Sequence, residues 1–377
     1  MADTSSEDQQ RNDKPYVIMA LQGGGALGAF QAGAYQALRE KGYEPDWVSG
    51  ISIGAINASI IAGNPQATRL SRLLNFWDIV AGNLDWWEYF PNYSEKLTNL
   101  WKVWLSAVDG VPGFFQPNIV PPWFAPRNSP EASSLFNVER LKKTLQSLID
   151  FDFLNDQKSP KQLRLSLGTT QVFGGLRETF ENFDGGSDRI TDHRITTEHI
   201  MASGADAPWF PGVVINGRLY WDGGITSNSS FKHIIPSLGD LTANEHKPVV
   251  VFVIDLWGAF NREPKTFDEV CWRIKQIQYS SGIEHDIDHG KHFLDRERLE
   301  QTMSGEGTEK WKSLIDIVRV SYRSDPNEIP LGDALFSRTE IERRIQDGYA
   351  ATSYLFEQDP YPWLLPRRYE GVRKHLL

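Results

Sequence analysis

The sequence has very little cysteine, no long apolar run and no excess of basic residues. Its single cysteine, Cys271, excludes an intrachain disulfide framework and a CxxC-type metal or redox site. No stretch of about 18 consecutive apolar residues occurs, so the sequence predicts no transmembrane helix. Because 49 Asp and Glu outnumber 39 Lys and Arg, the formal net charge of −10 argues against a dedicated nucleic-acid-binding protein.

The composition is that of a globular protein, with 377 residues of which 40% are hydrophobic and 23% charged. Residues 1–14 are polar and contain no apolar signal-peptide segment, so we expect a disordered N-terminus and a cytoplasmic protein with at most peripheral membrane contact. We expect an α/β domain at 15–260, in which 76–124 is an aromatic-rich insertion or lid. A helical C-terminal extension is expected at 261–377, where charged and polar helical patterns dominate.

The order of apolar runs and glycines predicts a parallel α/β sheet. Residues 16–21 form a short apolar run before a glycine cluster, which is typical of a buried strand, and the composition of 29–41 favours a helix. A second strand at 47–50 and a buried helix at 53–62 repeat this order. Residues 247–256 are nearly all apolar, as expected for a strand that is covered on both faces.

One pentapeptide has the pattern of a nucleophile elbow. The run Gly50-Ile51-Ser52-Ile53-Gly54 fits G-x-S-x-G, in which the glycines allow a serine to sit on a sharp strand-to-helix turn with its hydroxyl exposed. The expected strand before it and the expected helix after it are the right context for this motif. The alternative is an ordinary glycine turn with Ser52 as a helix N-cap.

A glycine-rich loop follows the first expected strand. Gly23, Gly24, Gly25 and Gly28 satisfy G-x-G-x-x-G, so the loop could bind a pyrophosphate, and Asp46 lies near the position of a ribose-binding acid. Consecutive glycines can also turn their backbone N–H groups toward one point and form an oxyanion hole. The motif alone does not decide between these two functions and a simple tight turn.

A third motif is an aspartate followed by two glycines. Asp222, Gly223 and Gly224 come directly after a short strand pattern, where a carboxylate is well placed to face a cleft. By itself this run favours a hairpin turn, because Asp-Gly is a common turn dipeptide.

Taken together and in this order, the motifs resemble those of the patatin-like phospholipases, which are lipid acyl hydrolases. The matching stretches are 23–33, 46–58, 202–211 and 222–224. The resemblance covers about residues 14–255 and is specific, because three separate motifs recur in the same order.

The resemblance implies a three-layer α/β/α fold with a mostly parallel central sheet and a helical C-terminal extension. It implies a serine acyl hydrolase that cleaves phospholipid, lysophospholipid or acylglycerol esters without cofactor or metal, with Ser52 as nucleophile and Asp222 as general base. Many members carry Arg or Lys where this chain has Leu27, a change that a hole built from backbone amides survives. The implied backbone positions are the oxyanion-hole glycines Gly23, Gly24, Gly25 and Gly28, the elbow glycines Gly50 and Gly54, and the Asp-motif glycines Gly223 and Gly224.

Two other functions are compatible with the same residues. A Ser-His-Asp esterase would use Ser52 with Asp255 and either His285 or His289, which follow in the order of that triad. Ser52 leaves room for only about two strands upstream, whereas that fold presents its nucleophile deeper in the sheet. A nucleotide-binding protein would use the glycine loop but would give Ser52 and Asp222 no role. A hydroxyacid ester is a further substrate option, and the head group, chain length and oligomeric state are left open.

Two further features have a functional and a structural interpretation. His285, His289 and His292 have the spacing H-x₃-H-x₂-H, which can hold zinc on one helix face, although a solvated polar face is the favoured interpretation. The aromatic segment 76–124 could be a lipid-facing rim. We favour core packing for most of it and expect the loop at 112–115 to be mobile and to contact substrate.

Overall fold

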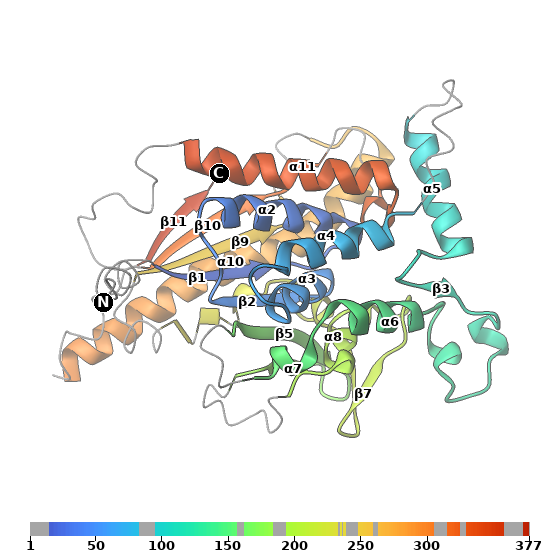
Figure 1. The fold of residues 1–377 in the computed structure, drawn as a ribbon, viewed down its shortest axis with the longest axis horizontal. Coiled ribbons are helices and arrows are strands. Elements are labelled where there is room, and N and C mark those ends of the chain that lie inside the picture. The colour runs from blue at the N-terminus through green and yellow to red at the C-terminus, as the bar shows by residue number, and fades with distance from the viewer. Residues whose placement is uncertain are drawn as a thin grey trace, which may run out of the picture.

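The structure is a computed structural model (Figure 1). It describes residues 15–82, 95–156, 162–183, 194–232, 234–235, 237–238, 248–258, 263–304, 315–324, 329–357 and 372–376. The N-terminal segment 1–14, expected to be disordered, lies outside the described residues.

The expected helices and strands of the N-terminal region are present, with ends that differ by at most a few residues. The strands are β1 (Tyr16–Leu21), β2 (Trp47–Ile51), β3 (Gln116–Pro117), β4 (Phe136–Asn137), β5 (Arg164–Gln171), β6 (Leu176–Glu181), β7 (Val213–Ile215), β8 (Arg218–Asp222), β9 (Val249–Asp255), β10 (Ile315–Ser321) and β11 (Val372–Leu376). The helices are α2 (Ala29–Glu40), α3 (Ile53–Ala62), α4 (Arg69–Val80), α5 (Glu95–Asp109), α6 (Glu139–Leu148), α7 (Phe151–Leu154), α8 (Thr197–Ser203), α10 (Phe267–Ser304) and α11 (Arg338–Tyr354). Short 3-10 helices include η1 (Gly25–Gly28), η5 (Gly223–Ile225) and η7 (Gly332–Ala334).

One large sheet organises the molecule. Among the described residues its strand order is β11-β10-β9-β1-β2-β5-β8-β7, with β6 also paired to β5. The pairs from β11 to β5 are parallel, whereas β6, β7 and β8 run antiparallel to their partners. The predicted α/β fold with a mostly parallel central sheet is therefore confirmed.

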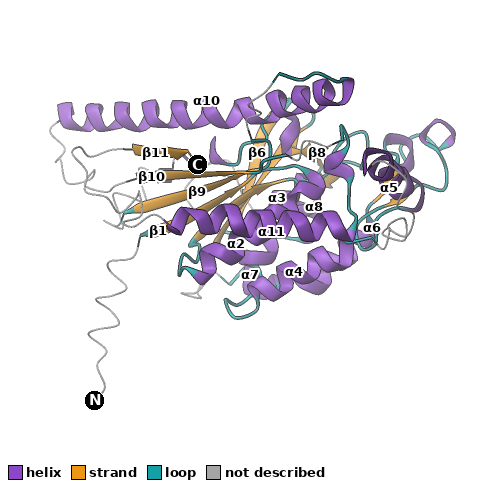
Figure 2. Cartoon of the chain, turned by 90° about the horizontal axis from the view of Figure 1, so that it is seen from above, coloured by secondary structure: helices purple, strands orange, loops and turns teal. Residues whose placement is uncertain are grey.

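Helices cover both faces of this sheet, so its central strands are apolar on both sides. In β1, Val17, Met19 and Leu21 belong to one core cluster, while Ile18 and Ala20 belong to another on the opposite face. The first cluster includes residues of α2 and α3, and the second includes residues of α10. Figure 2 shows α10 along one face and α2, α4 and α11 along the other. This double cover explains the nearly continuous apolar runs in the sequence.

The region after residue 261 contains the long helices expected of a helical extension, α10 and α11, and also contributes two strands that were not expected. The strands β10 and β11 continue the parallel sheet beyond β9. Asp316 and Arg319 interrupt the apolar run of β10 and hide its strand pattern, but both charges are paired inside the fold, Asp316 with His375 and Arg319 with Asp255. The domain boundaries themselves stay predictions.

The aromatic segment divides into a buried part and an exposed part. The side chains of Phe76 and Trp77 are buried in the core, whereas Trp101 and Trp104 on α5 are about half exposed. The loop at 112–115, expected to be mobile and to contact substrate, is packed: Phe114 is buried and its ring contacts those of Phe210 and Phe336. The expected mobility was wrong because the aromatic rings of this loop pack in the core, whereas the contact with substrate stays a prediction. Trp86 and Trp87 lie outside the described residues.

No helix among the described residues is both long enough and apolar enough to cross a bilayer.

A close approach of α2 and α11 at two glycines joins the C-terminal region to the N-terminal one. A Cβ atom on Gly33 of α2 would lie 1.8 Å from the carbonyl oxygen of Ile345, and a Cβ on Gly348 of α11 would lie 2.0 Å from that of Phe30. Distances this short leave no room for a side chain on either helix. The backbones of α2 and α11 therefore touch directly, as their parallel course in Figure 1 suggests.

We predict that Gly348→Ala lowers the free energy of unfolding by roughly 2 kcal/mol or more, because the new methyl group forces the two helices apart. Gly282→Ala is the matched control, since Gly282 lies in α10 and a Cβ atom at that position would have nothing within 4 Å. That variant should gain up to about 1 kcal/mol from the higher helix propensity of alanine. Urea unfolding of both variants measures the difference, and equal stabilities would contradict the close contact.

Candidate functional site

Ser52 lies on the sharp turn between β2 and α3. Its backbone has φ 56° and ψ −126°, a conformation that non-glycine residues rarely adopt. The flanking glycines are required by packing, because a Cβ on Gly50 would lie 2.2 Å from the carbonyl oxygen of Gly54, and one on Gly54 would lie 2.3 Å from that of Leu21. Ser52 is thus held at the start of α3, where the positive end of the helix favours negative charge.

Strand register brings Asp222 to the same place. Ile51, the last residue of β2, is paired with Gly168 of β5, and the next residue of β5, Thr169, is paired with Asp222 at the end of β8. The two pairings place Asp222 beside the turn that carries Ser52, although 170 positions separate them in the chain. Gly223 permits this approach, because a Cβ there would lie 2.4 Å from the carbonyl oxygen of Gly168.

The Asp222 carboxylate is buried and hydrogen-bonded. The backbone N–H of Gly224 donates to this carboxylate at 2.7 Å, and the Ser52 side chain is near enough to lower its pKa. Only 4% of its surface is exposed. The structure therefore brings together Ser52 and Asp222, with the glycines of both motifs around them.

Two causes raise the pKa of this carboxyl. Burial acts first, because it disfavours the charged form, and the negative charge of nearby Asp206 adds to it. The hydrogen bond from Gly224 and the nearby Ser52 side chain act in the opposite direction, and the resulting pKa of Asp222 is about 7 rather than 3.8. The pKa of Asp206 is itself raised to about 6, by burial and by the charge of Asp333.

The glycine loop lies next to Ser52. A Cβ on Gly23 would lie 2.9 Å from the Cβ of Ser52, and Gly25 has a left-handed φ of 53° with the carbonyl oxygen of Asp333 close by. Within the part of the chain that the structure describes, the backbone N–H groups of Gly24 and Gly25 donate to no other group. The two amides without a partner thus directly follow Gly23, the loop residue that lies beside the serine.

Gly28 has a different place in the same loop. A Cβ there would lie 2.5 Å from the Cγ1 of Ile53, and its carbonyl oxygen accepts a hydrogen bond of 2.9 Å from the Asn57 side chain. Gly28 therefore allows η1 and α3 to pack closely.

Four site residues have no motif signal of their own in the sequence. The Ser52 N–H donates to the carbonyl oxygen of Ser203, which belongs to the stretch 202–211 but has no role in the motifs. Asp206 lies in the same stretch, and its negative charge raises the pKa of Asp222. Asn228 and Trp257 hydrogen-bond to Gly23 and belong to no motif, so only the three-dimensional contact identifies them.

Comparison with known proteins places the chain in a family. The pattern of the family described as "Patatin-like phospholipase" matches residues 19–234. The chain belongs to the patatin-like phospholipases. A second family pattern, described as "Patatin phospholipase", matches residues 290–366. The resemblance inferred from the three motifs is thereby confirmed.

Two solved structures are similar to this patatin-like chain. VipD from Legionella pneumophila is 16% identical, with a TM-score of 0.41 over 91% of this chain and 67% of that one. The type III effector protein ExoU is 14% identical, with a TM-score of 0.32 over 90% of this chain and 52% of that one. A search of curated proteins gives no significant match.

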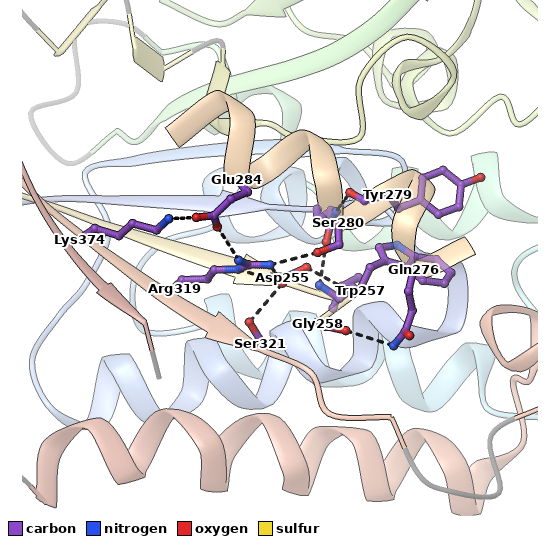
Figure 3. Close-up of polar contacts among 12 residues, drawn as sticks. Asp255, Trp257, Gly258, Gln276, Tyr279, Ser280, Glu284, Arg319, Ser321 and Lys374 are labelled. Atoms are coloured by element: carbon purple, nitrogen blue, oxygen red, sulfur yellow. Dashed lines mark hydrogen bonds and ion pairs between the residues drawn. The ribbon is translucent and has the colours of Figure 1, made fainter. Parts of the chain in front are cut away.

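The residues of the alternative serine–histidine triad are not assembled in this patatin-like chain. Figure 3 shows the Asp255 carboxylate bonded to Arg319 and Ser321, at 2.6 Å and 3.1 Å for the closest atoms. His285 and His289 are exposed on α10. Asp255 therefore has an ion-pair partner in place of an imidazole.

The described residues also do not form the alternative nucleotide site or the alternative zinc site. Asp46 accepts a hydrogen bond from the N–H of Val17 at the beginning of β1, whereas the glycine loop follows the end of that strand. An acid at the wrong end of β1 cannot serve a ribose next to the loop. Across the described ranges, His285, His289 and His292 included, no group of three or more metal-ligating side chains is placed to hold an ion.

Proposed function

We propose that this protein is a carboxylic ester hydrolase of the phospholipase A type, which cleaves acyl esters of phospholipids, lysophospholipids or acylglycerols through a Ser52–Asp222 dyad. Membership of the patatin-like phospholipases supports a lipid hydrolase. The observation that supports the dyad is the placement of Ser52 beside the buried Asp222 carboxylate, whose pKa is about 7 and is influenced by the Ser52 side chain. A base with this pKa is suited to take a proton at neutral pH.

The first half-reaction transfers the acyl group to the enzyme. The Ser52 oxygen attacks the ester carbonyl carbon while its proton passes to Asp222. The carbonyl oxygen becomes an oxyanion, which the free amides of Gly24 and Gly25 can stabilise together with the start of α3. When the C–O bond to the alcohol breaks, the proton on Asp222 goes to the leaving oxygen and an acyl-Ser52 ester remains.

The second half-reaction frees the enzyme. Water gives a proton to Asp222 and attacks the acyl-Ser52 carbonyl, so that a second oxyanion forms at the same amides. Collapse of this intermediate breaks the bond to Ser52, whose oxygen takes the proton back from Asp222. The fatty acid leaves, and both side chains return to their initial state.

A soluble chromogenic acyl ester tests the dyad. Ser52→Ala removes the nucleophile, and Asp222→Asn keeps the shape of the base but cannot accept the proton, so each should lower kcat by at least about 10³-fold. Ser59→Ala is the matched control, because Ser59 lies further along the same helix and its hydroxyl donates to the carbonyl oxygen of Ala55. A Ser52→Ala protein that still turns over at the wild-type rate would refute the dyad.

The acid limb of the pH profile is a second test. Only ionised Asp222 can act as base, so kcat/KM should rise tenfold per pH unit below about 7 and level off above it. Asp206→Asn removes a negative charge that raises the pKa of Asp222, and the limb should therefore move to lower pH. Asp78→Asn removes an exposed carboxylate remote from Asp222 and should leave the limb in place. An unmoved limb in the Asp206 variant would contradict this assignment.

An exposed apolar face on α5 supports contact with a lipid surface as part of the proposed function. Its residues recur every three or four positions along one side of the helix and are Leu97, Leu100, Trp101, Trp104 and Val108. The opposite side packs near the site, where Val103 clusters with Leu335 directly after η7. Aromatic residues exposed beside a lipid-cleaving site suit the boundary between water and acyl chains.

Replacement of both tryptophans should separate binding to a surface from chemistry. Trp101→Ala with Trp104→Ala should lower hydrolysis of phosphatidylcholine vesicles about tenfold and leave the rate with a soluble acyl ester unchanged. Tyr354→Ala is the control, because Tyr354 is similarly exposed but lies at the far end of α11 from η7. Equal rates on vesicles in the double variant and the wild type would argue against this face.

A further inference from the structure

Two side chains hold the carbonyl oxygen of Gly23. The Trp257 indole N–H donates to it at 2.8 Å, and the Asn228 amide N–H donates to it at 3.0 Å. The Asn228 side-chain oxygen also accepts the backbone N–H of Gly23 at 3.1 Å. Both side chains are buried, so neither bond competes with bulk water. We refer to Asn228 and Trp257 as the Gly23 clasp.

The clasp determines where the next amide points. The peptide bond between Gly23 and Gly24 is trans, since the only cis bond among the described residues is Ala207–Pro208. In a planar trans peptide the C=O and the following N–H point in opposite directions, so a fixed Gly23 carbonyl also fixes the Gly24 N–H. Glycines restrict the backbone least of all residues, and this peptide could otherwise rotate easily.

We propose that Asn228 and Trp257 are positioning residues that keep the Gly24 N–H aimed at the oxyanion formed during ester cleavage. The inference rests on the proposed function and assigns a role to two residues outside its dyad. It explains why the Gly23 carbonyl oxygen accepts hydrogen bonds from two buried side chains, whereas the adjacent Gly24 N–H has no partner among the described residues. Neither residue touches the substrate in this role, since both act through the Gly23–Gly24 peptide.

The position of Trp257 is fixed by the C-terminal part of the sheet. Its backbone N–H donates to Asp255 at 2.9 Å, and Asp255 is held in turn by Arg319 of β10 (Figure 3). The rings of Trp272 and Tyr279 on α10 pack against the indole in tilted arrangements, with centroids 5.3 Å and 4.9 Å away. The glycine loop thus depends on residues beyond the stretch 19–234 that the family pattern matches.

A second link ties the loop to the same elements. The Gln22 side chain accepts the backbone N–H of Leu256 at 2.8 Å and donates to the carbonyl oxygen of Tyr279 at 2.8 Å. Gln22 directly precedes Gly23, so the start of the loop is anchored to both the end of β9 and α10. The clasp therefore acts on the Gly23–Gly24 peptide, and the residue before this peptide, Gln22, is itself held by two side-chain hydrogen bonds.

The test compares two tryptophan variants of the full chain. Trp257→Phe removes the indole donor but keeps an aromatic ring. Trp47→Phe is the control, because Trp47 is a buried tryptophan of the other core cluster and its indole donates to Ser166 at 2.9 Å. With a soluble acyl ester, Trp257→Phe should lower kcat about 10- to 100-fold and change KM less than about twofold, because only the transition state loses a donor. Trp47→Phe should keep kcat.

A second readout separates orientation of the amide from mere folding. An acyl trifluoromethyl ketone forms a tetrahedral oxyanion with Ser52, whereas an ether analogue of the ester binds without forming one. The ketone should inhibit Trp257→Phe more weakly by the factor lost in kcat, and the ether should bind unchanged. Asn228→Ala should show the same pattern. Asn182→Ala is the control for loss of a buried amide, because the Asn182 side chain hydrogen-bonds to the backbone of Leu154, Leu163 and Leu165 and not to the glycine loop.

The outcomes are distinct. If Trp257→Phe and Asn228→Ala keep the wild-type kcat, or if ketone and ether weaken equally, the clasp has no role in orienting Gly24. If kcat falls only in proportion to the folded fraction seen by circular dichroism, the role is structural and the inference is overturned. If the wild type itself shows no Ser52-dependent hydrolysis, the proposed function fails and this inference fails with it.

Discussion

The fold keeps the carboxylate of Asp222 buried beside Ser52, and several of its strands and glycines serve that placement. Asp222 has almost no exposed surface, so its charge is costly, and the hydrogen bond from Gly224 and the nearby Ser52 side chain offset only part of that cost. The register of β2, β5 and β8 keeps the carboxylate there, and three glycines remove the side chains that would prevent the approach: Gly50, Gly54 and Gly223. The cost of burying this charge raises the pKa of Asp222 and so provides the basicity that the proposed chemistry requires.

Much of this arrangement could be predicted from the sequence because it depends on local patterns. The glycine loop, the elbow around Ser52 and the aspartate before Gly223 each follow an apolar run, and the ends of neighbouring strands meet at one edge of a sheet. Their order along the chain was enough to infer the family. The strands β1, β2 and β9 were predicted because their residues are apolar on both faces.

What could not be predicted depends on contacts between distant residues. The strand β10 could not be predicted because Asp316 and Arg319 interrupt its apolar run, and their partners, His375 and Asp255, lie far away in the sequence. Phe114 was assigned to a mobile loop because nothing near it in the sequence reveals the rings of Phe210 and Phe336. Trp257 lies in no motif, although its indole reaches the glycine loop.

The parallel pairing of β9 with β10 has a consequence for the architecture as a whole. A polypeptide that stopped after β9 would leave that strand at the border of the sheet, with seven consecutive buried residues and a free ladder of backbone donors and acceptors. Such a border invites association with other chains. The region after β9 therefore completes the sheet by covering this apolar strand, and its removal would expose the edge of β9.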